Sequence, residues 1–149
     1  MPKVEKILLP IDFAEQYESF LPWVSTFVEK FGATLYVVFV AQDLSEFSSF
    51  HVPHGNIKKF QTEALEAAEK KMGSTAKEYF KDFPRLETRV LTGSPAEKIL
   101  DLAKREVIDL IIMGTKGRKG LDYTIFGSVC RKVVREAPCP VVTINPAMG

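Results

Sequence analysis

Two uninterrupted apolar runs constrain the fold of this chain more than any other feature. One is Ile7-Leu8-Leu9, near the start of the chain, and the other is Leu110-Ile111-Ile112-Met113. A strand with one face in water alternates apolar and polar residues, whereas a strand buried on both faces of a parallel sheet is apolar throughout. The two runs therefore predict two central strands of a parallel sheet with helices on both faces.

Strand patterns and helical stripes alternate along the rest of the chain. Strands are expected at 4–11, 34–40, 86–91, 109–113 and 141–144. Helices are expected from 20 to 31, from 57 to 79, from 95 and from 128 to 136, with a polar loop at 42–56. One face of the second helix should point inward, made of Ile57, Phe60, Ala64, Ala67, Ala68, Met72, Ala76 and Tyr79. This order predicts an α/β fold in one domain, residues 1–149.

Helix boundaries have local signals. Gly32 follows the last apolar position of the first helix and is a typical C-terminal residue. Ser94-Pro95-Ala96-Glu97 is a capping box with proline at the first helical position, which predicts a helix start.

Charge predicts the order of the strands. The 86–91 strand carries Glu87 and Arg89, as an edge strand should. With right-handed crossovers, the order 3-2-1-4-5 places this strand at one edge and the two apolar runs at the centre. The winding then reverses between strands 1 and 4, and ligands bind beyond the carboxyl ends of strands at such a point. Pro10-Ile11-Asp12 and Met113-Gly114 end these two strands.

A glycine-bearing loop follows the second apolar run. It reads Met113-Gly114-Thr115-Lys116-Gly117, then nine residues, then Gly127-Ser128 ahead of the last helical pattern. Glycines let backbone approach a ligand, and a helix start offers unpaired N–H groups to phosphate. Ser128 and Val129 would contribute N–H groups if they lie in the first helical turn. The cations Lys116, Arg118 and Lys119 favour a polyphosphate, although a solvated loop, turn glycines and a helix-capping Asp12 explain the same residues without a ligand.

The loop is neither a Walker A motif nor the dinucleotide fingerprint, because no Gly-Lys-Ser/Thr occurs and the glycines at 114, 117 and 120 are spaced by three. The ordered set of motifs resembles the ATP-binding members of the universal stress protein family. These motifs are Pro10-Ile11-Asp12, Gly93-Ser94-Pro95-Ala96, Met113-Gly114-Thr115 with Gly117, Gly127-Ser128, and Ala137-Pro138-Cys139-Pro140-Val141.

The resemblance implies a compact, usually dimeric α/β domain that binds ATP or AMP. It implies that Gly114, Gly117, Gly127, Ser128 and the loop between them, with Gly120, wrap the ribose and phosphates. It also implies that Asp12 approaches the ribose or a phosphate-bound Mg or Mn ion, and that Pro10 and the backbone of Val40 border adenine. Ala14 departs from the family, whose members often have serine there.

Composition excludes several classes of function. A formal charge of +1 argues against binding to nucleic acid or acidic membranes. No apolar run approaches a membrane span and no signal peptide is visible, so a cytoplasmic location is expected. Cys130 and Cys139 are expected to be reduced thiols, with a regulatory disulfide as the alternative. His51 and His54 are expected in the solvent-exposed loop.

The sequence indicates binding rather than catalysis, because no base and nucleophile form a pair. The leading hypothesis is a nucleotide sensor or regulator of an unidentified protein partner, in which the nucleotide orders the 42–56 loop. The alternatives are a slow Mg-dependent ATP hydrolase and a nucleotide-free dimeric interaction module. The apolar strand at 141–144 would be an edge strand, which predicts a homodimer joined through it.

Overall fold

The computed structural model describes residues 1–13, 17–42, 54–115 and 123–145. Five strands form one parallel sheet in the order β3-β2-β1-β4-β5, as predicted. The strands are β1 (Lys6–Pro10), β2 (Thr34–Ala41), β3 (Leu86–Thr92), β4 (Leu110–Gly114) and β5 (Val141–Ile144). The helices are α1 (Tyr17–Phe31), α2 (His54–Tyr79), α3 (Pro95–Arg105) and α4 (Tyr123–Glu136).

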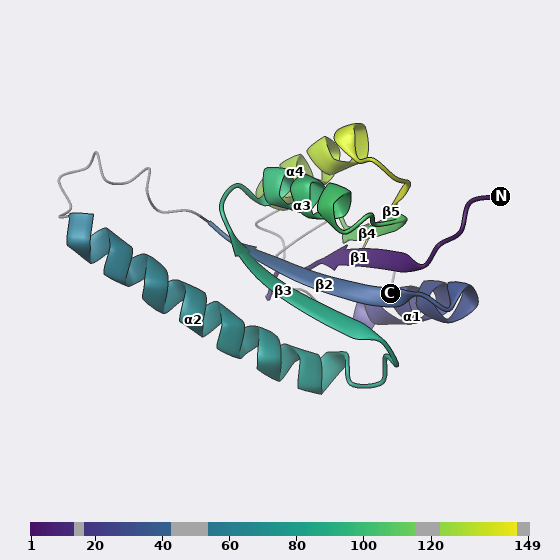
Figure 1. The fold of residues 1–149 in the computed structure, drawn as a ribbon, viewed down its shortest axis with the longest axis horizontal. Coiled ribbons are helices and arrows are strands. Elements are labelled where there is room, and N and C mark those ends of the chain that lie inside the picture. The colour runs from purple at the N-terminus through teal and green to yellow at the C-terminus, as the bar shows by residue number, and fades with distance from the viewer. Residues whose placement is uncertain (14–16, 43–53, 116–122, 146–149) are drawn as a thin grey trace.

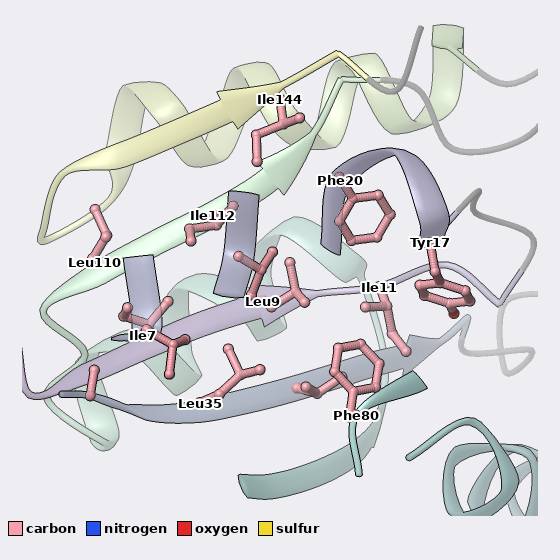
Figure 2. Close-up of a cluster of buried hydrophobic side chains, with 14 of the residues drawn as sticks. Ile7, Leu9, Ile11, Tyr17, Phe20, Leu35, Phe80, Leu110, Ile112 and Ile144 are labelled. Carbon is pink, nitrogen blue, oxygen red and sulfur yellow. The ribbon is translucent and has the colours of Figure 1, made fainter. Parts of the chain in front are cut away.

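The helices form two layers, one on each face of the sheet (Figure 1). Alternate residues of β1 explain the division, because Ile7 and Leu9 pack with α1 and α2 while Leu8 packs with α3 and α4. All three side chains are at most 1% exposed. Figure 2 shows the first of these cores, in which Phe20 of α1 and Phe80 after α2 lie on the same face of the sheet as Ile7, Leu9 and Ile112. The prediction of central strands buried on both faces is confirmed.

The central pair is β1 and β4, although they are far apart in the sequence. Ile7 pairs with Leu110 and Leu8 with Ile111. The Asp109 carboxylate, just before β4, accepts hydrogen bonds from the backbone N–H groups of Glu5 at 2.9 Å and Lys6 at 3.0 Å. This carboxylate therefore fixes the start of β1 against the start of β4.

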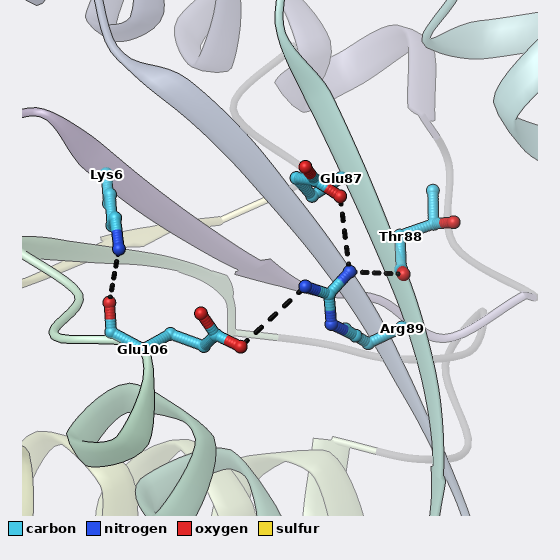
Figure 3. Close-up of polar contacts among 5 residues, drawn as sticks. All are labelled: Lys6, Glu87, Thr88, Arg89 and Glu106. Atoms are coloured by element: carbon cyan, nitrogen blue, oxygen red, sulfur yellow. Dashed lines mark hydrogen bonds and ion pairs between the residues drawn. The ribbon is translucent and has the colours of Figure 1, made fainter.

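Polar groups tie β3 to the rest of the structure at its exposed edge (Figure 3). The Arg89 guanidinium donates to the Thr88 carbonyl at 2.9 Å and lies 3.7 Å from the Glu106 carboxylate at the end of α3. It also lies over the ring of Tyr36, 5.6 Å from the centroid. The Lys6 ammonium lies 5.8 Å from the centroid of the same ring and donates a hydrogen bond to the Glu106 carbonyl at 2.9 Å.

Several local predictions are wrong. The strand expected at 4–11 is β1, which spans Lys6–Pro10 only. α2 begins at His54, so the part of the expected 42–56 loop from 54 onward is helical, while 43–53 and His51 lie outside the described residues. The predicted helix start is confirmed, because Ser94 occupies the N-cap of α3 and Pro95 is its first residue, but the Ser94 side chain makes no cap hydrogen bond.

The inward face of α2 is also displaced from the prediction. Ile57, Ala68 and Met72 are buried as expected, but Phe60 is 69% exposed and Ala64 and Ala67 are exposed. The buried stripe instead includes Thr75, which is 4% exposed. Because alanines occur on several faces of this helix, the periodicity of the sequence did not identify the inward face.

Candidate functional site

The candidate site is built where β1 and β4 end side by side. β1 pairs with β4 and ends at Pro10, and β4 ends at Gly114. Pro10 and Gly114 are both buried. The helix that follows β1 covers one face of the sheet and the helix that follows β4 covers the other. The direction of winding therefore reverses between β1 and β4, and such a reversal leaves room beyond the carboxyl ends of the two strands.

The chain remains fixed to its neighbours as it leaves each strand. The Ile11 N–H donates to the Val38 carbonyl at 2.8 Å, and the Thr115 N–H donates to the Ile144 carbonyl at 2.9 Å. Asp12 and Thr115 are the half-buried residues at these two exits. A residue with a carboxylate therefore follows β1 and a residue with a hydroxyl follows β4, both at the carboxyl end of the sheet.

Aromatic groups hold the turn after β1. The Tyr17 hydroxyl donates to the Asp12 carbonyl at 3.3 Å. The Phe13 ring lies 4.2 Å from the ring of Phe39 near the end of β2. The sequence gave no signal for the contact of Tyr17 with Asp12, because that contact depends on the path of the chain between them.

The predicted site residues fall into three groups. Pro10, Ile11, Met113 and Gly114 are buried at the ends of the central strands. Asp12, Val40, Thr115, Gly127 and Val129 are half-buried, and Ser128 is exposed. Lys116, Gly117, Arg118 and Gly120 lie outside the described residues. The side chains of Ile11 and Met113 belong to the two hydrophobic cores, and Val129 packs against the second, so any ligand contact would use their backbone.

The predicted start of the last helix is wrong. α4 begins at Tyr123, so Gly127, Ser128 and Val129 lie inside it and not in its first turn. In an α-helix, N–H groups beyond the first turn donate to carbonyls four residues earlier. The N–H groups of Ser128 and Val129, which were expected to bind phosphate, are therefore used by the helix itself. The glycine at 127 did not end the helical pattern because a glycine inside a helix costs only about 1 kcal/mol relative to alanine.

Gly127 nevertheless has free space beside its Cα, among the described residues, which a ligand would need. A Cβ built on it would meet no heavy atom within 4 Å among the described residues. Neither crowding nor a left-handed backbone requires glycine there, since the only described glycines with positive φ are Gly32 and Gly93. Among the described residues, nothing fills the space beside Gly127. Gly73, inside α2, also has no heavy atom of a described residue within 4 Å of a Cβ built on it and provides a comparison.

Sequence reasoning gave no indication of a groove at the opposite end of the sheet. Its volume is about 350 Å³, and it lies between the C-terminal turn of α1 and the segment before β3. Val28, Ala33, Phe83, Glu29 and Asp82 are among the residues that line it. None of the predicted site residues contributes to this groove, so it is separate from the candidate site.

The described residues hold two further negative findings. No three His, Cys, Asp or Glu side chains within the described ranges gather as the ligands of a metal ion would. No helix in those ranges combines the length and apolar character that crossing a bilayer requires.

Comparison with known proteins identifies the family. Residues 3–145 match the model of the universal stress protein family. The universal stress protein MJ0531 of Methanocaldococcus jannaschii is 30% identical over 147 residues, which cover 95% of this chain and 82% of that protein.

Solved structures agree with the sequence match. The structure of MJ0577, from the same organism, superimposes with a TM-score of 0.78 at 28% identity and covers 97% of each chain. A universal stress protein from Archaeoglobus fulgidus, solved in complex with dAMP, has a TM-score of 0.61 and covers 95% of this chain and 98% of its own. At 20% identity this second likeness shows the fold alone. This chain belongs to the universal stress protein family.

Proposed function

We propose that this protein binds an adenine nucleotide, ATP or AMP, beyond the carboxyl ends of β1 and β4 and acts as a nucleotide-dependent sensor or regulator in a stress response. The observation that carries the proposal is the reversal of winding between these two strands, with Asp12 and Gly114 at their ends. Family membership and the dAMP held by a protein of the same fold support it.

In this proposal, the roles divide among the site residues as the family resemblance implies. Pro10 and the backbone of Val40 border the adenine, and the Asp12 carboxylate approaches the ribose. Gly114 and Thr115 begin the phosphate-binding loop, which continues through Lys116, Gly117, Arg118 and Gly120 of the sequence. At α4, contact comes from the open side of Gly127 and the exposed residue Ser128, because the N–H groups of 127–129 are used by the helix.

A metal ion would arrive with the nucleotide. Asp12 is the one carboxylate that the proposal assigns to the site, and the described residues contain no cluster of three possible ligands. A single carboxylate can supplement, but not replace, phosphate oxygens around Mg²⁺ or Mn²⁺. We therefore infer that the phosphates supply most of the ligands to any such ion.

Calorimetric titration tests the proposal directly. The purified protein is titrated with ATP, ADP and AMP, with and without Mg²⁺, and a sample is denatured so that any co-purified nucleotide is released and identified by mass. Binding of an adenine nucleotide at a ratio of one per chain is expected. No heat with any of the three, and no released nucleotide, would overturn the proposal in favour of a nucleotide-free interaction module.

Slow ATP hydrolysis is the alternative for the same site. It requires a group that positions water against the terminal phosphate, as well as stabilisation of the charge that develops there. The proposal assigns no such group, so we expect turnover far slower than release of the nucleotide. Repeated turnover within minutes that disappears in Asp12→Ala would instead identify an ATPase.

A further inference from the structure

The turn after β1 is held by a hydroxyl that comes from the first residue of the next helix. Tyr17 begins α1 and is 4% exposed. Its hydroxyl donates to the carbonyl oxygen of Asp12 at 3.3 Å, across the chain that joins β1 to α1. The hydrogen bond therefore closes the turn that carries the Asp12 carboxylate.

The ring that carries this hydroxyl is fixed by other rings. Its centroid lies 4.5 Å from that of Tyr79, 5.6 Å from Phe20 and 6.0 Å from Phe80. Figure 2 shows Tyr17 next to Ile11, with Phe20 and Phe80 on the same face of the sheet. Aromatic rings packed this closely have few alternative positions. The hydroxyl is therefore kept at one place relative to β1.

The same turn is held from its other side. Ile11 donates its N–H to Val38, and the Phe13 ring packs at 4.2 Å against Phe39. Both contacts come from β2, whereas Tyr17 comes from α1. Asp12 thus lies between two anchors, at the edge of the sheet where the proposed nucleotide binds.

We propose that the Tyr17 hydroxyl positions Asp12 for the nucleotide. Tyr17 is a positioning residue that acts through the Asp12 backbone and does not touch the ligand. A preorganised carboxylate binds more tightly because less freedom is lost when the ligand arrives. This inference rests on the proposed function for its effect on affinity, but its structural part can be measured without nucleotide.

Tyr17→Phe removes the hydroxyl and keeps the ring. Tyr79→Phe is the matched control, because it removes a hydroxyl from the adjoining ring, whose pKa is raised by burial and by Glu78 on its own helix. In ligand-free protein, the Ile11 amide, bonded to Val38, should exchange its hydrogen several-fold faster in Tyr17→Phe and at the wild-type rate in Tyr79→Phe. Equal exchange in all three proteins would overturn the inference.

Nucleotide affinity supplies the second measurement. Loss of one hydrogen bond predicts that Tyr17→Phe weakens ATP binding by about three- to tenfold, and Tyr79→Phe leaves it unchanged. In an Asp12→Ala background, Tyr17→Phe should have no further effect, since the carboxylate it positions is gone. A Tyr17→Phe loss that persists in that background would refute positioning through Asp12. Failure of the wild-type protein to bind would instead refute the proposed function and with it the effect on affinity, while the exchange rates would still decide whether Tyr17 holds the turn.

Discussion

Val107 has a left-handed backbone conformation that residues other than glycine rarely adopt. It follows the end of α3 with a φ of 53°, and its side chain is 70% exposed. Its N–H donates to Lys104 and the next N–H, of Ile108, donates to Ala103, which together form a Schellman motif. Gly32 occupies the same position after α1, with a φ of 62° and the equivalent two hydrogen bonds. One helix therefore ends with the residue suited to this motif and the other does not.

Exchanging these residue types predicts opposite changes in stability. Val107→Gly keeps the left-handed conformation and removes its steric cost, which is roughly 1–2 kcal/mol for residues with a Cβ, so we expect a net gain of about 1 kcal/mol after the added freedom of the unfolded chain. Gly32→Val should lose at least as much, although a Cβ there would lie 3.9 Å from Arg85, an ordinary contact. Urea unfolding of both variants measures the changes. A destabilised Val107→Gly would show that the strain estimate is wrong.

Burial of the two thiols predicts that they react slowly, and this can be checked. Both are free, as expected from the sequence. Burial raises the pKa of Cys130, and burial followed by the charge of Asp109 raises the pKa of Cys139. Because the thiolate is the reactive form, both should be alkylated more slowly at pH 8 than free cysteine.

The raised pKa values of the two thiols also predict how stability depends on pH. Their contribution to the free energy of unfolding is constant below the ordinary thiol pKa of about 8.5 and declines as the pH rises above it.

At the scale of elements, the sequence predicted the order of the strands, which depends on the pattern of burial. It did not predict the start of α4 or the contact of Tyr17, which depend on local packing. The order of strands followed from the apolar runs around Leu8 and Ile111, since only strands covered on both faces have that composition. The start of α4 did not follow, because residues 123–126 are compatible with either loop or helix. The contact of Tyr17 with Asp12 was also missed, since it requires the path of the turn and not only its composition.

The glycine inside α4 distinguishes a ligand requirement from a structural one. Gly127→Val and Gly73→Val both add a side chain to a helix where the structure leaves open space. Neither should reduce the free energy of unfolding by more than about 0.5 kcal/mol, because valine is no worse in a helix than glycine. Only Gly127→Val should abolish nucleotide binding, by filling the surface that the ligand approaches. Titration and thermal unfolding of both variants test this, and wild-type affinity in Gly127→Val would remove α4 from the site.

For the whole molecule, the two edges of the sheet differ. The Thr88 carbonyl on the outer side of β3 is already bonded to Arg89, and charged side chains line that strand. The Pro140 carbonyl just before β5 accepts from Ile111, and the Ile144 carbonyl accepts from Thr115 just after β4, so the backbone groups of Thr143 between them point outward. β5 is uncharged, and its outward groups can pair with another chain. We therefore propose that two copies join through β5.

Proline substitution tests this dimer with an internal control. Thr143→Pro removes an outward N–H without removing a hydrogen bond to β4. We expect the wild-type protein to sediment at twice the 16.7 kDa of one chain and Thr143→Pro to sediment as a monomer. Thr88→Pro makes the same change on the β3 edge and should leave the dimer intact. A wild-type monomer at micromolar concentration would contradict the proposal.

The pairing of β1 with β4 has a consequence for how the protein is made. Asp109 binds the backbone of Glu5 across 104 positions, and one whole side of β1 has no partner until β4 exists. During synthesis, β1 thus has one unpaired side until residues 110–114 have been made. Contacts this distant in sequence form slowly. The nascent chain therefore cannot complete this sheet before β4 and β5 have been synthesised, and β1 is the strand that most needs shielding meanwhile.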